Sequence, residues 1–279
     1  MLDIRDWLNV ILPRGKGSLI VYSLYADESY EDTCGHVTVA GYLIASKPLA
    51  LLTDAWATAL GPLDYFHMKE GHHYKHPDVY ERLLKLMTCD HLTAGFAASV
   101  VQAEYATVMD QKLKGQPMRY WFGGAYSFCV QAIAGLANKW LDENNPGERD
   151  VAYVFEAGHA RQGEASMFLE KLNSDPAFSA RKRQLRYFSH TFMDGKRREA
   201  GALHAADILA WNITDGRRRN SFSEAGRRLV ESVPVLTIHY PESGIRDTLQ
   251  AQLEFCNFYD SLRRATRLRA PADGHDSLR

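Results

Sequence analysis

Three acidic residues stand where a carboxylate can do chemistry. Asp27 follows a run of apolar residues with the composition of a strand, and Glu156 follows a second such run. Asp207 lies among alanine, isoleucine, leucine and tryptophan, a pattern typical of a buried helix. Buried carboxylates that lie together raise one another's pKa unless a cation binds between them. Asp27, Glu156 and Asp207 therefore predict a site for a hard divalent ion, Mg²⁺ or Mn²⁺.

Glu28 adjoins Asp27, and adjacent residues on a strand point to opposite faces of the sheet. We therefore assign Asp27 to the acidic centre and expect Glu28 to join it only where the strand has already ended. The alternative for Asp27, Glu28 and Glu156 is an ordinary polar strand end before a turn. Asp207 fits that alternative less well, because a lone aspartate in a buried helix requires a partner or a metal.

A predicted loop combines basic and acidic side chains with several histidines. Lys69 is the candidate to contact a phosphate, and His67 the candidate to position a substrate or to move a proton. His204 is a further candidate to contact phosphate or to orient water. A zinc ion bound by the loop histidines is an alternative. Their spacing matches no strong zinc-binding pattern, so we favour a place for them at the polar rim of the site. The loop histidines are His67, His72, His73 and His76.

Alternating strand and helix patterns place these residues at the ends of elements. Predicted strands cover 18–26, 36–45, 91–101, 151–155, 184–193 and 233–240. Predicted helices cover 47–60, 77–88, most of 102–143, 162–172, 203–216, 223–232 and 246–268. Strands that begin in a hairpin and then alternate with helices predict an α/β fold with a mixed five- or six-stranded sheet flanked by helices.

Composition and charge narrow the class of protein. The chain of 279 residues is 46% hydrophobic and 24% charged, which is typical of a globular protein. We expect an extension over 1–17, one domain over 18–268 and a disordered tail over 269–279. Because we find no signal peptide, no membrane-spanning run and no CxxC pair, we expect a cytoplasmic protein without a zinc ribbon.

The net charge of −1 excludes a general polyanion binder, but the charge is uneven along the chain. Residues 181–228 carry 12 Lys and Arg against 5 Asp and Glu. This excess predicts a basic surface that faces phosphate, and a solvated face without a ligand is the alternative. The aromatic residues interleaved over 119–128 can stack bases, but we favour a place in the core for them.

Four motifs, taken in order, resemble the family catalogued as domain of unknown function 3800. The similarity covers about 20–260, and one departure is His204, where members of the family usually carry glutamine. The motifs are Asp27-Glu28-Ser29, the stretch Phe66 to Glu70, Phe155-Glu156-Ala157-Gly158, and Ala206-Asp207-Ile208-Leu209-Ala210-Trp211.

The resemblance implies a ribonuclease-H-like fold in which clustered carboxylates hold divalent metal. The leading hypothesis is therefore metal-dependent phosphodiester hydrolysis of nucleic acid, with two ions about 3.5 to 4 Å apart held by Asp27, Glu156 and Asp207. Two alternatives stay open. One is a catalytically inactive module that binds nucleic acid or protein, and the other is a metal-dependent hydrolase of a small phosphorylated molecule.

Overall fold

The computed structural model describes residues 22–31, 35–113, 123–147, 150–158, 162–175 and 179–254. Within them lies one six-stranded mixed sheet in the order β5-β4-β1-β2-β3-β6. Its strands are β1 (Tyr22–Glu31), β2 (His36–Ala45), β3 (Ala94–Val101), β4 (Val151–Glu156), β5 (Tyr187–Met193) and β6 (Val235–Tyr240). The predicted α/β class with a mixed sheet is confirmed.

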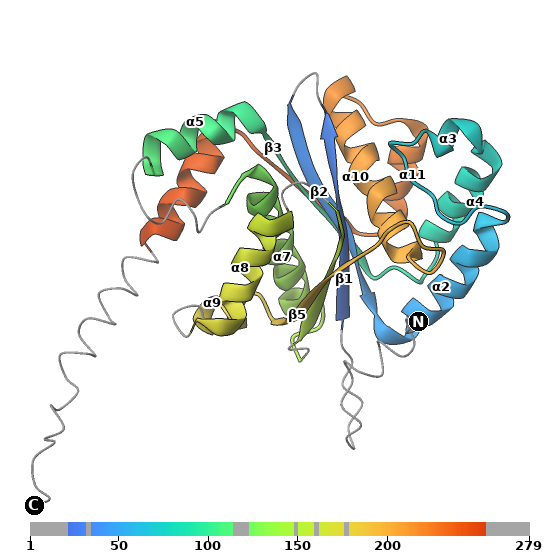
Figure 1. The fold of residues 1–279 in the computed structure, drawn as a ribbon, viewed down its shortest axis with the longest axis horizontal. Coiled ribbons are helices and arrows are strands. Elements are labelled where there is room, and N and C mark those ends of the chain that lie inside the picture. Colours follow the sequence, from blue (N-terminus) through green and yellow to red (C-terminus); the bar gives the residue numbers. More distant parts are fainter. Residues whose placement is uncertain are drawn as a thin grey trace, which may run out of the picture.

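Helices cover both faces of the sheet (Figure 1). The α7 side carries α5 (Gln102–Leu113), α7 (Ala125–Asn144), α8 (Gln162–Ser174) and α9 (Ser179–Gln184). The α10 side carries α2 (Ser46–Leu60), α3 (His72–Lys75), α4 (Pro77–Met87), α10 (Gly201–Arg219) and α11 (Glu224–Ser232). Residues 242–254 are also helical.

Strand direction changes around the hairpin of β1 and β2. The strand β2 pairs antiparallel with both β1 and β3, whereas β4 runs parallel to β1. The outer strands β5 and β6 run parallel to β4 and β3, respectively. The carboxyl ends of β1 and β4 therefore lie at the same end of the sheet, which brings Asp27 close to Glu156.

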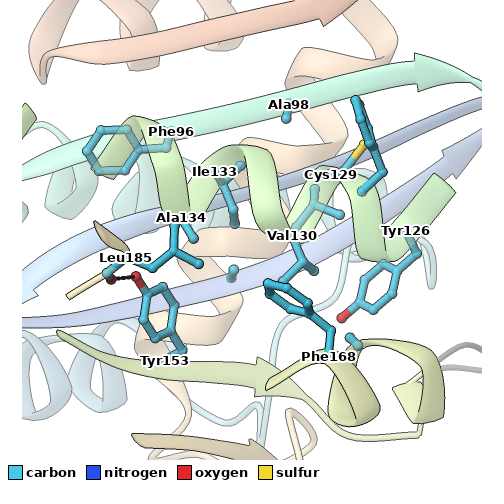
Figure 2. Packing of buried hydrophobic residues seen from close by; sticks show 14 of the residues in the cluster. Phe96, Ala98, Tyr126, Cys129, Val130, Ile133, Ala134, Tyr153, Phe168 and Leu185 are labelled. Atoms are coloured by element: carbon cyan, nitrogen blue, oxygen red, sulfur yellow. Dashed lines mark hydrogen bonds between the residues drawn. The ribbon is translucent and has the colours of Figure 1, made fainter. Parts of the chain in front are cut away.

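Alternation along the strands builds a separate apolar core on each face of the sheet. Leu24 faces α7 and Tyr25 faces α10, in accordance with the two-residue period of a strand. Figure 2 shows Val130, Ile133 and Ala134 of α7 lying against the sheet. The buried hydroxyl of Tyr153 donates a hydrogen bond of 2.6 Å to the carbonyl of Leu185 (Figure 2).

Most predicted elements are present, and the first strand shows the most informative difference. It was expected to end at residue 26, but β1 continues through Asp27 and Glu28 to Glu31. Its backbone pairs with β2 as far as Glu31 opposite His36, so the ladder is satisfied whatever the side chains are. Residues 18–21 of the predicted strand lie outside the described residues.

Smaller differences occur in two connecting segments. The one-turn helix α3 lies within the histidine loop, and α9 precedes β5, which begins at Tyr187 rather than at 184. The predicted extension 1–17, residues 119–122 of the aromatic stretch and the tail 269–279 lie outside the described residues. Tyr126 and Phe128 of that stretch are buried in the core, as favoured. In the part of the chain that the structure describes, no helix combines the length and apolarity that crossing a bilayer requires.

Candidate metal centre

A pocket lies beside β1 at the point where its neighbour β4 has ended. Pairing between β1 and β4 ends at Ala26 opposite Phe155, and β4 itself ends at Glu156, while β1 continues to Glu31. Beside this step lies a cavity of about 570 Å³. Glu28, Glu156 and Asp207 line it together with basic and aromatic side chains. Three acidic residues far apart in the sequence thus border one pocket.

Asp27, His67 and Glu156 form a group that could hold a metal ion. Each offers one ligand atom, and these atoms all lie within 4.8 Å of one another. Asp27 is buried, whereas His67 and Glu156 are partly exposed to the pocket. Carboxylate oxygens suit Mg²⁺ and Mn²⁺, and an imidazole nitrogen suits borderline transition-metal ions. The donor set therefore fits a divalent ion.

Burial and mutual repulsion make this centre unfavourable without a cation. Burial raises the pKa of Asp27 well above its usual range, and the charges of Glu28, Asp207 and Glu156 raise it further. The backbone N–H of Glu28 donates a hydrogen bond of 2.8 Å to Asp27 Oδ1, which opposes that rise in pKa. The predicted repulsion among the carboxylates is thus present in the structure.

Glu28 borders the pocket although β1 has not ended there. Alternation turns Glu28 to the α7 side and Asp27 to the α10 side, but β4 no longer covers β1 at this point, so the pocket reaches Glu28, while Asp27 stays buried. Burial raises the pKa of Glu28 to about 7, with a further contribution from the charge of Glu156. With the strand unbroken, the group that could hold a metal contains Asp27 and not Glu28, as expected, and Glu28 only borders the pocket.

Asp207 lies next to the metal-binding group rather than within it. Its Oδ2 accepts a hydrogen bond of 2.6 Å from the backbone N–H of Met68 and lies 3.9 Å from His67 Nδ1. Burial raises the pKa of Asp207 to about 6, while His67 and the Met68 N–H act in the opposite direction. The sequence assigned Asp207 to the metal, and the structure places His67 in the group with Asp27 and Glu156.

The loop that carries His67 is tied down at several points. The backbone N–H of His67 donates to His72 Nδ1 at 3.1 Å, and the backbone N–H of Lys69 donates to His67 Nδ1 at 3.2 Å. Farther along, Glu70 accepts hydrogen bonds from Tyr65 and Lys196. The exposed Lys69 lines the pocket, as a residue that contacts a phosphate must.

The other loop histidines lie to one side. His72 Nε2 is 3.7 Å from Glu70 Oε2, and the His72 and His76 rings meet edge to face. The His73 ring packs against Tyr74 and Trp211. Within the described residues, neither His72, His73 nor His76 belongs to a group of three ligands that could hold a metal. They support the loop, as the polar-rim interpretation expected.

His204 is fully engaged inside the protein. Trp56 Nε1–H donates to His204 Nδ1 at 3.1 Å, so Nε2 carries the hydrogen and donates to the Gly195 carbonyl at 2.7 Å. The residue is 3% exposed. Because neither ring nitrogen is available, the prediction that His204 contacts phosphate or orients water is wrong. It instead fixes the Gly195 loop, where a Cβ would overlap Glu156 Oε1.

The pH dependence of unfolding tests this role of His204. Burial lowers its pKa from 6.5 to about 4, so the unfolded state binds more protons between these values. Stability contributed by the neutral ring is therefore present above pH 6.5 and is lost as pH falls to about 4. We expect His204→Gln to remove roughly 3 kcal/mol of this acid sensitivity. Urea unfolding of wild type and His204→Gln at pH 4 and pH 7 measures this difference. The same change in the free energy of unfolding between the two pH values in both proteins would contradict it.

The cations of the basic segment 181–228 lie on separate elements, and several are paired with acids, such as Arg228 with Glu81 and Arg197 with Asp194. Arg198 donates to the carbonyls of Ala57, Gly61 and Leu63. Arg217 to Arg219 end α10, roughly 15 to 18 Å along the helix axis from Asp207. Solvation and pairing with nearby acids account for much of the excess of Lys and Arg in this segment.

Two aromatic residues at the pocket had no assigned role in the sequence. Trp211 and Tyr30 both line the cavity. The four-residue spacing from Asp207 to Trp211 places both on one face of a helix and is the signal that could have identified Trp211.

Comparison with known proteins adds no assignment to this site. No family model matches the chain, and no curated protein matches it. The chemistry of the centre is therefore argued from its geometry.

Proposed function

We propose that this protein is a metal-dependent phosphodiesterase that acts on nucleic acid. The observation that carries the proposal is the convergence of Asp27, His67 and Glu156 within 4.8 Å at one pocket. A catalytically inactive binding module would show carboxylates too far apart to share a cation. Their convergence therefore favours the enzyme.

The residues of the pocket would have different roles in such a reaction. Asp27, His67 and Glu156 would hold a divalent ion, which when bound supplies Lewis-acid stabilisation of the charge that develops on a phosphoryl group. Lys69 would hold a non-bridging phosphate oxygen through its ammonium group. The Lys69 N–H orients the His67 imidazole through Nδ1, and Asp207, fixed by the Met68 N–H, places its carboxylate 3.9 Å from that nitrogen.

The strand order supports the ribonuclease-H-like fold that the four motifs imply. Antiparallel β1, β2 and β3 are followed by β4 and β5 parallel to β1, in the order β5-β4-β1-β2-β3, and β6 is added beyond β3. In this arrangement Asp27 comes from the central strand and Glu156 from its parallel neighbour. The order is compatible with the fold and with a carboxylate-based metal centre.

A hydrolase of small phosphorylated molecules is the second candidate. The observation in its favour is the size of the cavity, about 570 Å³, which is in the range of pockets that enclose small ligands. The dispersed and paired cations of 181–228 also give this candidate more weight than the sequence did.

A cleavage panel separates these functions. The purified protein is incubated with labelled single- and double-stranded DNA and RNA, and with nitrophenyl phosphate mono- and diesters, in Mn²⁺, in Mg²⁺ and in EDTA. We expect metal-dependent cleavage of a nucleic acid and none in EDTA. Turnover of the monoester alone would establish the small-molecule function, and no turnover of any substrate would favour the inactive module.

The imidazole ligand leads to a prediction about metal preference. Since nitrogen ligands suit Mn²⁺ better than Mg²⁺, we expect faster turnover in Mn²⁺. His67→Ala should lower the Mn²⁺-supported rate at least about tenfold more than the Mg²⁺-supported rate. His91→Ala, which alters a histidine outside both the metal-binding group and the histidine loop, is the matched control. Equal losses in both metals would show that His67 is not a ligand.

A further inference from the structure

Trp211 occupies a distinctive position on α10. The helix is buried from Gly201 through Ala210, and Trp211 is the first residue whose side chain is partly exposed. It follows Asp207 by four residues, so the two side chains are neighbours on one face of the helix, with Cβ atoms about 5 to 6 Å apart. Trp211 lines the same cavity as Asp207. A large aromatic surface therefore lies one helical turn beyond the acidic centre.

The indole of Trp211 is held in place by its neighbours. The His73 ring lies 5.4 Å from it, centroid to centroid, and His73 in turn lies 6.0 Å from the Tyr80 ring. Part of the Trp211 side chain also packs against the core on the α10 side. A braced indole offers a fixed face to a ligand and loses little conformational freedom when the ligand binds.

The rest of the pocket completes a site for one nucleotide. Tyr30, 49% exposed, lines the cavity from β1, and Gln102 supplies an amide that can bond to a base edge. Lys69 and the metal-binding group provide for a phosphate. The volume of about 570 Å³ suits a ligand of nucleotide size.

We propose that Trp211 stacks an unpaired nucleobase whose phosphate lies at the metal centre, so that the substrate is single-stranded nucleic acid. The inference rests on the proposed phosphodiesterase function and specifies its substrate class. Bases within a duplex are stacked on their neighbours, and a duplex would have to be opened before a base could reach Trp211. Stacking on an aromatic ring requires no particular base, so little sequence preference follows.

The test varies the base and the aromatic ring independently. Three substrates share one sequence: a single strand, the same strand with an abasic site beside the scissile phosphate, and the full duplex. The proteins are wild type, Trp211→Ala, Trp211→Phe and, as an exposed aromatic control outside the pocket, Tyr74→Ala. The measurement is kcat/KM for each pair in Mn²⁺.

We expect Trp211→Ala to lower kcat/KM on the single strand about 10- to 100-fold, and Trp211→Phe and Tyr74→Ala to retain most of it. The abasic strand should be cleaved poorly and equally by wild type and Trp211→Ala. Equal losses on the normal and abasic strands, or preference for the duplex, would overturn the inference while leaving the phosphodiesterase function in place.

Binding supplies a readout that needs no cleavage. Fluorescence anisotropy of the same labelled strands is measured in Mn²⁺, and binding of uridine monophosphate is measured separately by calorimetry. Base-dependent binding that is lost in Trp211→Ala supports the stacking site even when no bond is cut, a result that would count against the phosphodiesterase alone. If no strand binds but uridine monophosphate binds tightly, the ligand of the site is a free nucleotide and not single-stranded nucleic acid. No binding of either would overturn the stacking site.

Discussion

Replacing Asp27 with asparagine should abolish metal-dependent cleavage and, at the same time, stabilise the metal-free protein at pH 8. Loss of a buried metal ligand removes several kcal/mol of transition-state stabilisation, or about a thousandfold in rate or more. The amide carries no charge, so it is not repelled by Glu28, Asp207 and Glu156. It keeps an oxygen that can accept from the Glu28 N–H. We expect roughly 1 to 3 kcal/mol of added stability without metal.

Urea unfolding with EDTA and with Mn²⁺ measures both parts of this prediction. Wild type should gain stability on adding Mn²⁺, by about 2.7 kcal/mol at a hundred times the dissociation constant, and Asp27→Asn should gain almost none. Asp90→Asn changes an exposed aspartate far from the pocket and should behave as wild type. An Asp27→Asn protein that is destabilised without metal, or that still cleaves, would refute the assignment.

Raising the pH from 6.5 to 8.5 should destabilise the metal-free protein and tighten its hold on Mn²⁺. The folded-state pKa of Glu28 is raised to about 7 and that of Asp27 well above its usual range, so the folded state binds more protons than the unfolded state. Stability from these carboxyl groups is present at low pH and is lost as pH rises through their folded pKa values. Glu28 alone contributes roughly 1 kcal/mol in this window, and Asp27 adds to it.

The histidines oppose this effect only in the lower half of the window. Burial lowers the pKa of His72, His73, His190, His204 and His239, and their unfolded rings, half protonated at pH 6.5, have lost nearly all their protons by about pH 7.5. Thermal melting in EDTA should therefore show a falling midpoint between pH 7.5 and 8.5. Saturating Mn²⁺ should remove or reverse that slope, because protons compete with the ion for the same oxygens. A midpoint that is flat in EDTA would mean that the carboxyl groups are ionised throughout.

Local sequence pattern was sufficient to locate the acidic centre. Apolar runs followed by an acid indicated Asp27 and Glu156, and a lone acid in a buried helix indicated Asp207. Asp27 and Glu156 share one group that could hold a metal, and Glu156 and Asp207 line one pocket. An apolar run and a helix period are local properties of the chain, which is why spacing alone pointed to these residues.

The other features of the site depend on tertiary contacts. Glu28 reaches the pocket because β4 ends early beside β1, a fact of pairing that the β1 sequence does not contain. His204 is engaged by Trp56, 148 residues earlier, and His67 joins Asp27 and Glu156 through the path of a loop. The basic excess of 181–228 was counted along the chain, whereas the fold spreads it over separate elements. Contacts between distant segments cannot be predicted from the spacing of residues along the sequence.

The order of the elements along the chain has a consequence for biosynthesis. The helix α10 covers the face of β1 and β2 that carries Tyr25, Tyr42 and Ile44, yet it is made long after both strands. At the usual speed of translation, the ribosome takes roughly 10 to 35 s to extend the chain from Ala45 to Arg219. During that interval an apolar hairpin surface is without its cover, so a nascent chain stalled before α10 is expected to require a chaperone.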